Sequence, residues 1–167
     1  MSEKYLSETT VERLESFIGV EEEPSPWFQV TQEDVSAFAD LTRDHNFIHI
    51  DPERAAQETH FGGTIAHGFY TLSLLSHLFD SIEPAADHPF RDAVTMVNYG
   101  INKLRFITPV MVGKSFRVSR KLTSAREKGE EWVQLTYDVM VEIKGEAKPA
   151  LKAEWLILMI CGPVDSQ

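Results

Sequence analysis

The densest group of side chains that could do chemistry lies between Thr42 and His49. Asp44 and His49 are five residues apart, which places them about 140° apart on a helix and on opposite faces of a strand. Only a turn brings both into one cavity, and Asp and Asn favour turns. A carboxylate and an imidazole around one water form a competent acid–base pair. The alternative is that Asp44 and Asn46 only cap the chain and that His49 is a buried core histidine.

His45 and His49 also have the i, i+4 spacing of the HExxH zinc motif. Asn46 stands where that motif requires its general-base glutamate, and no third ligand stands out in the sequence. The sequence therefore predicts no metal site, and an activity that does not depend on zinc.

A second region, residues 61–70, combines glycines with an apolar helix that begins near Ile65. Free backbone N–H groups at such a helix start can stabilise a developing oxyanion. Gly68 would let a ligand approach the backbone closely, and His67 stands directly before it. The segment contains no phosphate-binding fingerprint of the GxGxxG or GKS/T type. The alternative is that these glycines serve only close packing between helix and sheet and that His67 packs at the helix start.

Helices are expected on both sides of these two regions. Thr9 and Glu12 have capping-box spacing, which predicts a short N-terminal helix. Thr31 predicts the start of a helix to about residue 43, and Asp51 before Pro52 predicts another to about residue 58. Apolar residues at spacings of four, three, three and four predict a long buried helix: Ile65, Phe69, Leu72, Leu75 and Phe79.

The second half of the chain changes to a period of two. Alternating apolar and polar residues predict strands over 116–122, 133–143 and 151–160. Residues 94–106 also alternate, but the apolar parity flips near Asn102, which indicates a bulge. A first strand is expected near Phe28. This order predicts an α+β domain with a curled antiparallel sheet of about five strands wrapped around the long helix.

Composition narrows the classes of protein. The 167 residues are 43% hydrophobic, which fits one globular domain over 26–162, an N-terminal helix and tether over 1–25, and a tail over 163–167. The net charge of −10 disfavours nucleic acid and anionic membranes as partners. The N-terminus is polar, no apolar run is long enough to span a membrane, and Cys161 is the single cysteine. We therefore expect a cytoplasmic protein without an intrachain disulfide.

Basic residues gather in the predicted strands: Lys103, Arg105, Lys114, Arg117, Arg120 and Lys121. Such residues usually lie on solvated strand faces. Some of them could instead meet the phosphates of CoA or of a carrier-protein arm.

The run from Phe38 to Leu75 resembles the MaoC-like, or (R)-specific enoyl-CoA hydratase, family. That family has a pattern close to G-D-x-N-P-[LIV]-H followed by an A-H-G element. The first element is matched by Asp44, Asn46, Ile48 and His49, and the second by Ala66, His67 and Gly68. Arg43 replaces the glycine and Phe47 the proline. Residues 98–100 and 103–106 are similar to the nodulation-protein-N-like branch, and the resemblance covers about residues 24–160.

The resemblance implies a hotdog fold, a homodimer, and hydration of trans-2-enoyl-CoA to (R)-3-hydroxyacyl-CoA. It implies that Asp44 and His49 activate water, that Asn46 orients the Asp44 turn, and that Gly68, with His67, binds the thioester carbonyl. No cofactor is expected, because the thioester itself stabilises the enolate once it is hydrogen-bonded. Two alternatives share the fold: an acyl-CoA thioesterase and a non-catalytic acyl-CoA-binding subunit.

Overall fold

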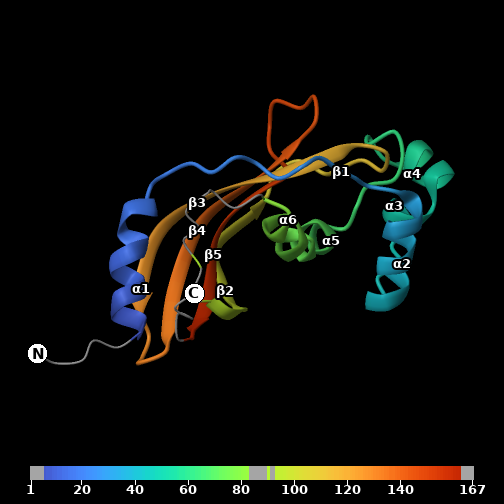
Figure 1. The fold of residues 1–167 in the computed structure, drawn as a ribbon. Helices are drawn as coiled ribbons and strands as arrows, with labels where there is room; N and C mark the ends of the chain where they lie inside the picture. Colours follow the sequence, from blue (N-terminus) through green and yellow to red (C-terminus); the bar gives the residue numbers. More distant parts are fainter. Residues whose placement is uncertain (1–5, 83–89, 91–92, 163–167) are drawn as a thin grey trace, which may run out of the picture.

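The computed structural model describes residues 6–82, 90 and 93–162. Residues 1–5 and the expected C-terminal tail over 163–167 lie outside the described residues. One antiparallel sheet has the order β1-β3-β4-β5-β2, with strands β1 (Phe28–Gln29), β2 (Ala93–Phe106), β3 (Ser115–Glu127), β4 (Trp132–Ile143) and β5 (Leu151–Cys161). The expected curled sheet of about five strands is confirmed, and Figure 1 shows how it arches over the central helices.

Alternation along the strands builds the core. On β4, each odd-numbered residue from Val133 to Ile143 is buried, and its even-numbered neighbours are at least partly exposed. The same alternation runs along β5, so the inner faces of the two paired strands form one apolar surface. Burying that surface is the main favourable contribution to folding. Two short helices, α5 (Gly68–Ser73) and α6 (Leu75–Asp80), lie under the arch (Figure 1).

The central helix differs from the expectation of one helix from Ile65 to Phe79. Helix α5 begins only at Gly68, and Leu74 separates it from α6. The cause lies in the backbone of the preceding residues. The N–H of Ile65 donates to Ile48 O at 3.0 Å, and the N–H of Ala66 donates to Val110 O at 2.8 Å. These N–H groups therefore bond to segments distant in the sequence, and the chain here is not helical.

The remaining helices stand at the two ends of the sheet (Figure 1). At one end is α1 (Leu6–Leu14), which contacts β3, β4 and β5 and is followed by the 3-10 turn η1 (Glu15–Phe17). Because α1 begins before Thr9, the expected capping box at Thr9 is wrong. Leu14 is fully buried, so α1 belongs to the core. At the other end lie α2 (Gln32–Thr42), α3 (Phe47–Ile50) and α4 (Pro52–Glu58).

The predicted caps of α2 and α4 are confirmed. Thr31 accepts a hydrogen bond from the Asp34 N–H at 3.1 Å, and Asp51 accepts one from the Arg54 N–H at 3.0 Å. The single turn α3 was not expected, because four residues are too few to show a helical period.

Strand β2 forms an edge of the sheet and contains the predicted bulge. Its pairing with β5 shifts register between Asn102 and Arg105, and Lys103 has φ 53°. Large apolar side chains stay exposed along its length: Val94, Met96, Val97, Tyr99 and Ile101. None of the helices within the described residues is long and apolar enough to cross a membrane.

Candidate active site

His49 is held in one orientation by the backbone of a distant segment. It lies in the single turn α3, and the residue is 8% exposed. Its Nδ1 lies 2.7 Å from the carbonyl oxygen of Ile65. Because a carbonyl can only accept, Nδ1 carries the proton and Nε2 keeps the lone pair. The imidazole is therefore oriented with an unprotonated nitrogen available as a base.

The pKa of His49 is lowered from its ordinary value, chiefly because burial disfavours the charged ring. The hydrogen bond to Ile65 acts in the opposite direction, His67 lowers the pKa further, and Asp44 raises it. A lowered pKa keeps the imidazole neutral near pH 7, which is the form a general base requires.

Asp44 stands in the turn that joins α2 to α3. The turn begins at Arg43, which has φ 66°, a left-handed conformation that favours glycine. Asp44 Oδ1 accepts from the Asn46 N–H at 3.4 Å, and Asn46 in turn caps α3 by accepting from the Ile48 N–H at 3.4 Å. The predicted turn is therefore present, and Asn46 lies at its centre.

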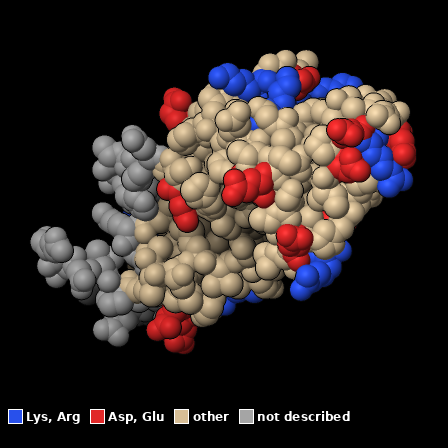
Figure 2. Space-filling view, turned by 90° about the vertical axis from the view of Figure 1, so that its right-hand side faces the viewer, with Lys and Arg blue, Asp and Glu red and all other residues tan. Residues whose placement is uncertain are grey.

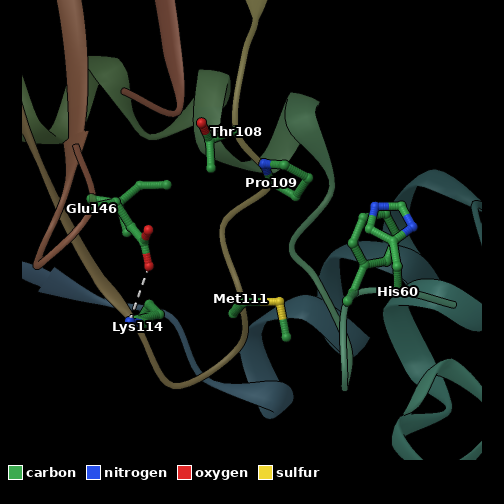
Figure 3. A pocket seen from close by; sticks show the side chains of 8 residues that line it. His60, Thr108, Pro109, Met111, Lys114 and Glu146 are labelled. Atoms are coloured by element: carbon green, nitrogen blue, oxygen red, sulfur yellow. Dashed lines mark hydrogen bonds and ion pairs between the residues drawn. The ribbon is translucent and has the colours of Figure 1, made fainter. Parts of the chain in front are cut away.

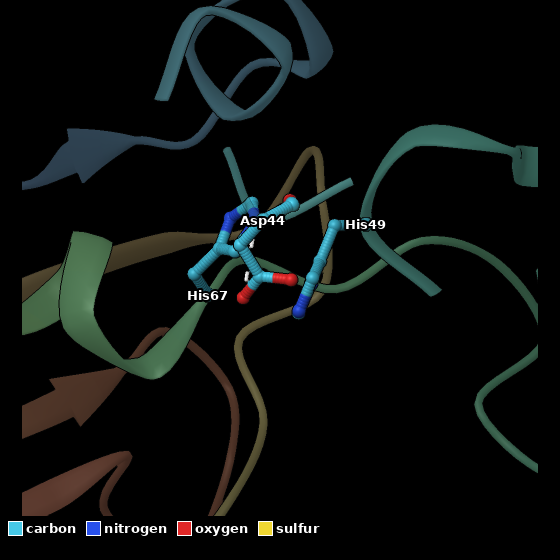
Figure 4. A group of neighbouring side chains, drawn as sticks. All are labelled: Asp44, His49 and His67. Carbon is cyan, nitrogen blue, oxygen red and sulfur yellow. Dashed lines mark hydrogen bonds and ion pairs between the residues drawn. The ribbon is translucent and has the colours of Figure 1, made fainter. Parts of the chain in front are cut away.

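The turn brings Asp44 close to His49, as the spacing of the two residues required. One ligand atom from each of Asp44, His49 and His67 lies within 4.8 Å of the other two (Figure 4). A single water could bridge the carboxylate and the imidazole, since hydrogen bonds of about 2.8 Å on each side span that gap. The Asp44 side chain remains 57% exposed.

His67 lies behind His49. Its side chain is 3% exposed, and its Nε2 donates to the backbone oxygen of Asp44 at 3.0 Å. Its ring stacks on that of His49 with centroids 3.7 Å apart and planes 27° apart. Phe38 packs against His67 at a centroid distance of 5.2 Å. His67 does not line the cavity described below, so the expectation that it contacts substrate stays a prediction.

The three residues contain the donor types of a two-histidine, one-carboxylate metal site. Their geometry is poorly suited to one. The lone pairs of an imidazole lie in the ring plane, and stacked rings point them side by side rather than at a shared point. Nε2 of His67 is also already committed to the Asp44 carbonyl.

A cavity of about 380 Å³ opens beside His49, and we call it the His49 cavity. His49 and Gly68 line its polar end, and apolar side chains line most of the rest: Phe69, Phe106, Ile107, Val110 and Leu151. The N–H of Gly68, first in α5, needs a partner outside the helix. A Cβ on Gly68 would lie 3.0 Å from the Phe106 ring, so the glycine also permits close packing.

Figure 3 shows a second cavity of about 280 Å³, the Lys114 cavity, and Thr108 and Pro109 line both cavities. Lys114 pairs with Glu146 there at 3.3 Å, and both side chains are nearly half exposed. His60, also at its rim, is exposed.

Most of the strand cations are paired with carboxylates. Arg117 bonds Glu142 at 2.7 Å, and Arg120 bonds Glu22 at 2.6 Å and is 11% exposed. Lys103 pairs with Glu154 at 3.1 Å. On the face in Figure 2, uncharged side chains dominate and Lys and Arg lie mainly at the margins. A contact of some of these cations with phosphates, the other possibility raised by the sequence, stays a prediction.

Sequence reasoning missed three contributors to the site. Gln32 ties α2 to it by donating to His49 O at 2.7 Å and accepting from Thr64 Oγ1 at 2.6 Å. The Ile65 carbonyl orients His49, and Phe106 covers Gly68. A backbone carbonyl leaves no motif in a sequence. The bulge near Asn102 was the one signal that β2 changes direction before Phe106.

The chain is similar to known proteins over most of its length. The family model described as "MaoC like domain" matches residues 14–143. The chain is 42% identical over 160 residues to nodulation protein N of Rhizobium leguminosarum bv. viciae, covering 96% of this chain and 97% of that protein. It is 44% identical over 133 residues to 3-hydroxyacyl-thioester dehydratase Z of Mycobacterium tuberculosis, covering 80% of this chain and 84% of that one.

Solved structures give the same result for the fold. The (R)-hydratase from A. caviae involved in PHA biosynthesis superposes with a TM-score of 0.63 at 26% identity. That match covers 86% of this chain and 97% of the hydratase. The curled sheet over central helices is therefore a hotdog fold, as the sequence resemblance implied.

Proposed function

Because this chain belongs to the MaoC-like domain family, we propose that it hydrates trans-2-enoyl-CoA to (R)-3-hydroxyacyl-CoA and catalyses the reverse dehydration. The similarity to a 3-hydroxyacyl-thioester dehydratase and to an (R)-hydratase supports a hydro-lyase acting on acyl thioesters. One observation carries the proposal: a buried imidazole, whose Nδ1 is hydrogen-bonded to Ile65, has a carboxylate within one water's reach of the ring and lies beside an apolar cavity.

Water is activated between Asp44 and His49. The carboxylate accepts a hydrogen bond from one O–H of the water, which stays intact. Nε2 of His49 takes the proton of the other O–H as the water oxygen attacks C3 of the enoyl group. That proton then passes from His49 to C2. The product gains OH at C3 and H at C2, so one water is consumed and both residues return to their starting states. Asn46 contributes by fixing the Asp44 turn.

The thioester carbonyl is held by the backbone N–H of Gly68. Negative charge on that oxygen grows as C3 is attacked, and a donor already in place stabilises it at low reorganisation cost. The acyl chain occupies the apolar part of the His49 cavity. We propose that neither a metal nor a redox cofactor takes part, so that chelation leaves the rate unchanged.

Crotonyl-CoA distinguishes the proposed activity from its alternatives. Hydration removes the enoyl absorbance and forms (R)-3-hydroxybutyryl-CoA, whereas a thioesterase releases a free thiol. A binding subunit would retain crotonyl-CoA unchanged. Loss of absorbance without thiol, with the (R) product confirmed by chiral chromatography, is the expected outcome. Thiol release, or binding without turnover, on a panel of enoyl-CoA chain lengths would overturn it.

We further propose a homodimer that forms through β2. An edge strand with exposed apolar side chains invites pairing with another strand, and twofold symmetry closes such a contact. Light scattering should give about twice the chain mass of 19.0 kDa at micromolar concentration. Ile101→Lys should shift the mass towards that of one chain, and a single-chain mass for the wild type contradicts the proposal.

A further inference from the structure

We propose that His67 is a positioning residue that holds Asp44 and His49 in their reactive arrangement without touching substrate. This inference rests on the hydratase function proposed above and assigns His67 a role different from substrate binding. Its first support is location: His67 is 3% exposed and is not among the residues that line the His49 cavity. The ring therefore acts on the reaction through its neighbours.

The hydrogen bond to the Asp44 turn fixes the protonation pattern of His67. Nε2 lies 3.0 Å from the Asp44 carbonyl oxygen, so Nε2 carries a proton. Nδ1 is buried and has no hydrogen-bond partner among the described residues. The hydrogen bond from Nε2 therefore ties the start of α5 to the turn that carries Asp44.

The stacking contact serves His49. The two rings lie 3.7 Å apart, and Phe38 backs His67 from a third element, α2. His49 is thus fixed twice, by the Ile65 carbonyl in its plane and by His67 across its face. The His67 ring also covers one face of His49, and its presence lowers the pKa of His49.

Two variants separate the contacts. His67→Gln retains an amide donor near the position of Nε2 and loses the aromatic face. His67→Phe retains the face and loses the donor to the Asp44 carbonyl. Misplacing a catalytic group by about 1 Å can cost about 100-fold in rate, so each variant should lower kcat about 10- to 100-fold. KM should stay within about twofold of wild type, by the same reasoning that no substrate contact is removed.

The pH dependence gives a readout that general destabilisation would not move. Within the described residues, the ionisable groups that act on the pKa of His49 are Asp44, from the turn, and His67, at the start of α5. Replacing the ring with Gln uncovers His49, so the acidic limb of the kcat profile should move to higher pH, and it should move less in His67→Phe. Val139→Ala, a core change on β4 away from both cavities, is the matched control for stability.

The outcomes are distinct. Lower kcat with unchanged KM in both variants, and wild-type kcat per folded molecule in Val139→Ala, support the positioning role. A raised KM with unchanged kcat would instead show a substrate contact and overturn it, as would wild-type kinetics in both variants.

NMR titration of the His49 ring tests the same contacts without any substrate. If the wild type hydrates no enoyl thioester, the proposed function fails, while an unchanged His49 titration in His67→Gln would reject the positioning role separately.

Discussion

Two cavities share Thr108 and Pro109 in their lining, and they differ in how their ionisable groups are held. In the Lys114 cavity, the ammonium group pairs with Glu146, and His60 lies exposed against the ring of Phe61. In the His49 cavity, the imidazole is buried, one nitrogen is hydrogen-bonded to a backbone carbonyl, and the other has no hydrogen-bond partner among the described residues. The two spaces are of similar size, about 280 and 380 Å³.

The difference teaches that volume alone does not identify a reactive cavity. Exposed charges that pair with one another are screened by water and have little capacity left for a ligand. A buried base whose orientation is fixed, with a carboxylate within reach of the same water, has the parts that acid–base catalysis needs. The comparison therefore predicts that changes at His49 and changes at His60 have very different consequences.

The largest expected effect is loss of turnover when the acid–base pair is broken. Asp44→Asn keeps the size of the side chain, and His49→Asn retains a donor for the Ile65 carbonyl, so both should fold. Each should lower the hydration rate of crotonyl-CoA about 100- to 10,000-fold, the scale of acid–base catalysis. His60→Gln, in the other cavity, should keep wild-type kinetics. If Asp44→Asn or His49→Asn turned over every enoyl-CoA tested at close to the wild-type rate, the assignment of these two residues as the acid–base pair would be wrong.

A somewhat smaller effect is expected at Gly68. A Cβ there would lie 3.0 Å from the ring of Phe106 and would crowd the thioester, so Gly68→Val should lower the rate by about 100- to 1000-fold, the usual cost of losing an oxyanion donor. Thermal unfolding is measured beside the rate, because α5 is packed under the sheet.

The double variant Gly68→Val with Phe106→Leu separates catalysis from packing. The shorter side chain gives room to the new Cβ, so stability should recover while the rate stays low. Full recovery of the rate in the double variant would show that Gly68 serves only the close packing of Phe106.

A more modest effect concerns stability in acid. Burial lowers the pKa of His49 in the folded protein, so the unfolded chain takes up this proton at higher pH. Stability from this group is therefore complete above about pH 6.5 and declines as the pH falls below that value. The drop in melting temperature between pH 7.5 and 5.5 should be smaller in His49→Asn than in wild type. The exposed His60, replaced by Gln, provides the control; equal drops in all three proteins would exclude a contribution from His49.

The smallest effect is expected at Arg43, at the start of the turn that joins α2 to α3. Arg43 has φ 66°, and glycine adopts this conformation more easily than any residue with a Cβ. Arg43→Gly should raise the free energy of unfolding by less than about 1 kcal/mol, because relief of strain is partly offset by a more flexible unfolded chain. Denaturant unfolding measures this change, with Arg43→Ala as the comparison. An equal gain in Arg43→Ala would mean that the side chain, and not the backbone, is responsible.

Local patterns predicted much of the fold. Alternation along residues 133–143 gave β4, and the parity flip near Asn102 located the bulge in β2. The long central helix was predicted less well. Its apolar spacing continues back to Ile65, yet the backbone there bonds Ile48 and Val110, and the helix begins three residues later. The spacing of apolar residues indicates which side chains are buried. It does not indicate which groups accept hydrogen bonds from the backbone N–H groups.

The sequence by itself determined that Asp44 and His49 had to meet across a turn, because neither a helix nor a strand brings residues five apart to one side. It also determined the caps that start α2 and α4. Only the tertiary structure decided which carbonyl orients His49, which ring stacks on it and which aromatic residue covers Gly68. Those partners come from segments 16 to 38 residues away in the chain. They meet because residues 64–66 pair with 48 on one side and 110–112 on the other. Such long-range pairing depends on how the whole chain closes, and local periodicity carries no record of it.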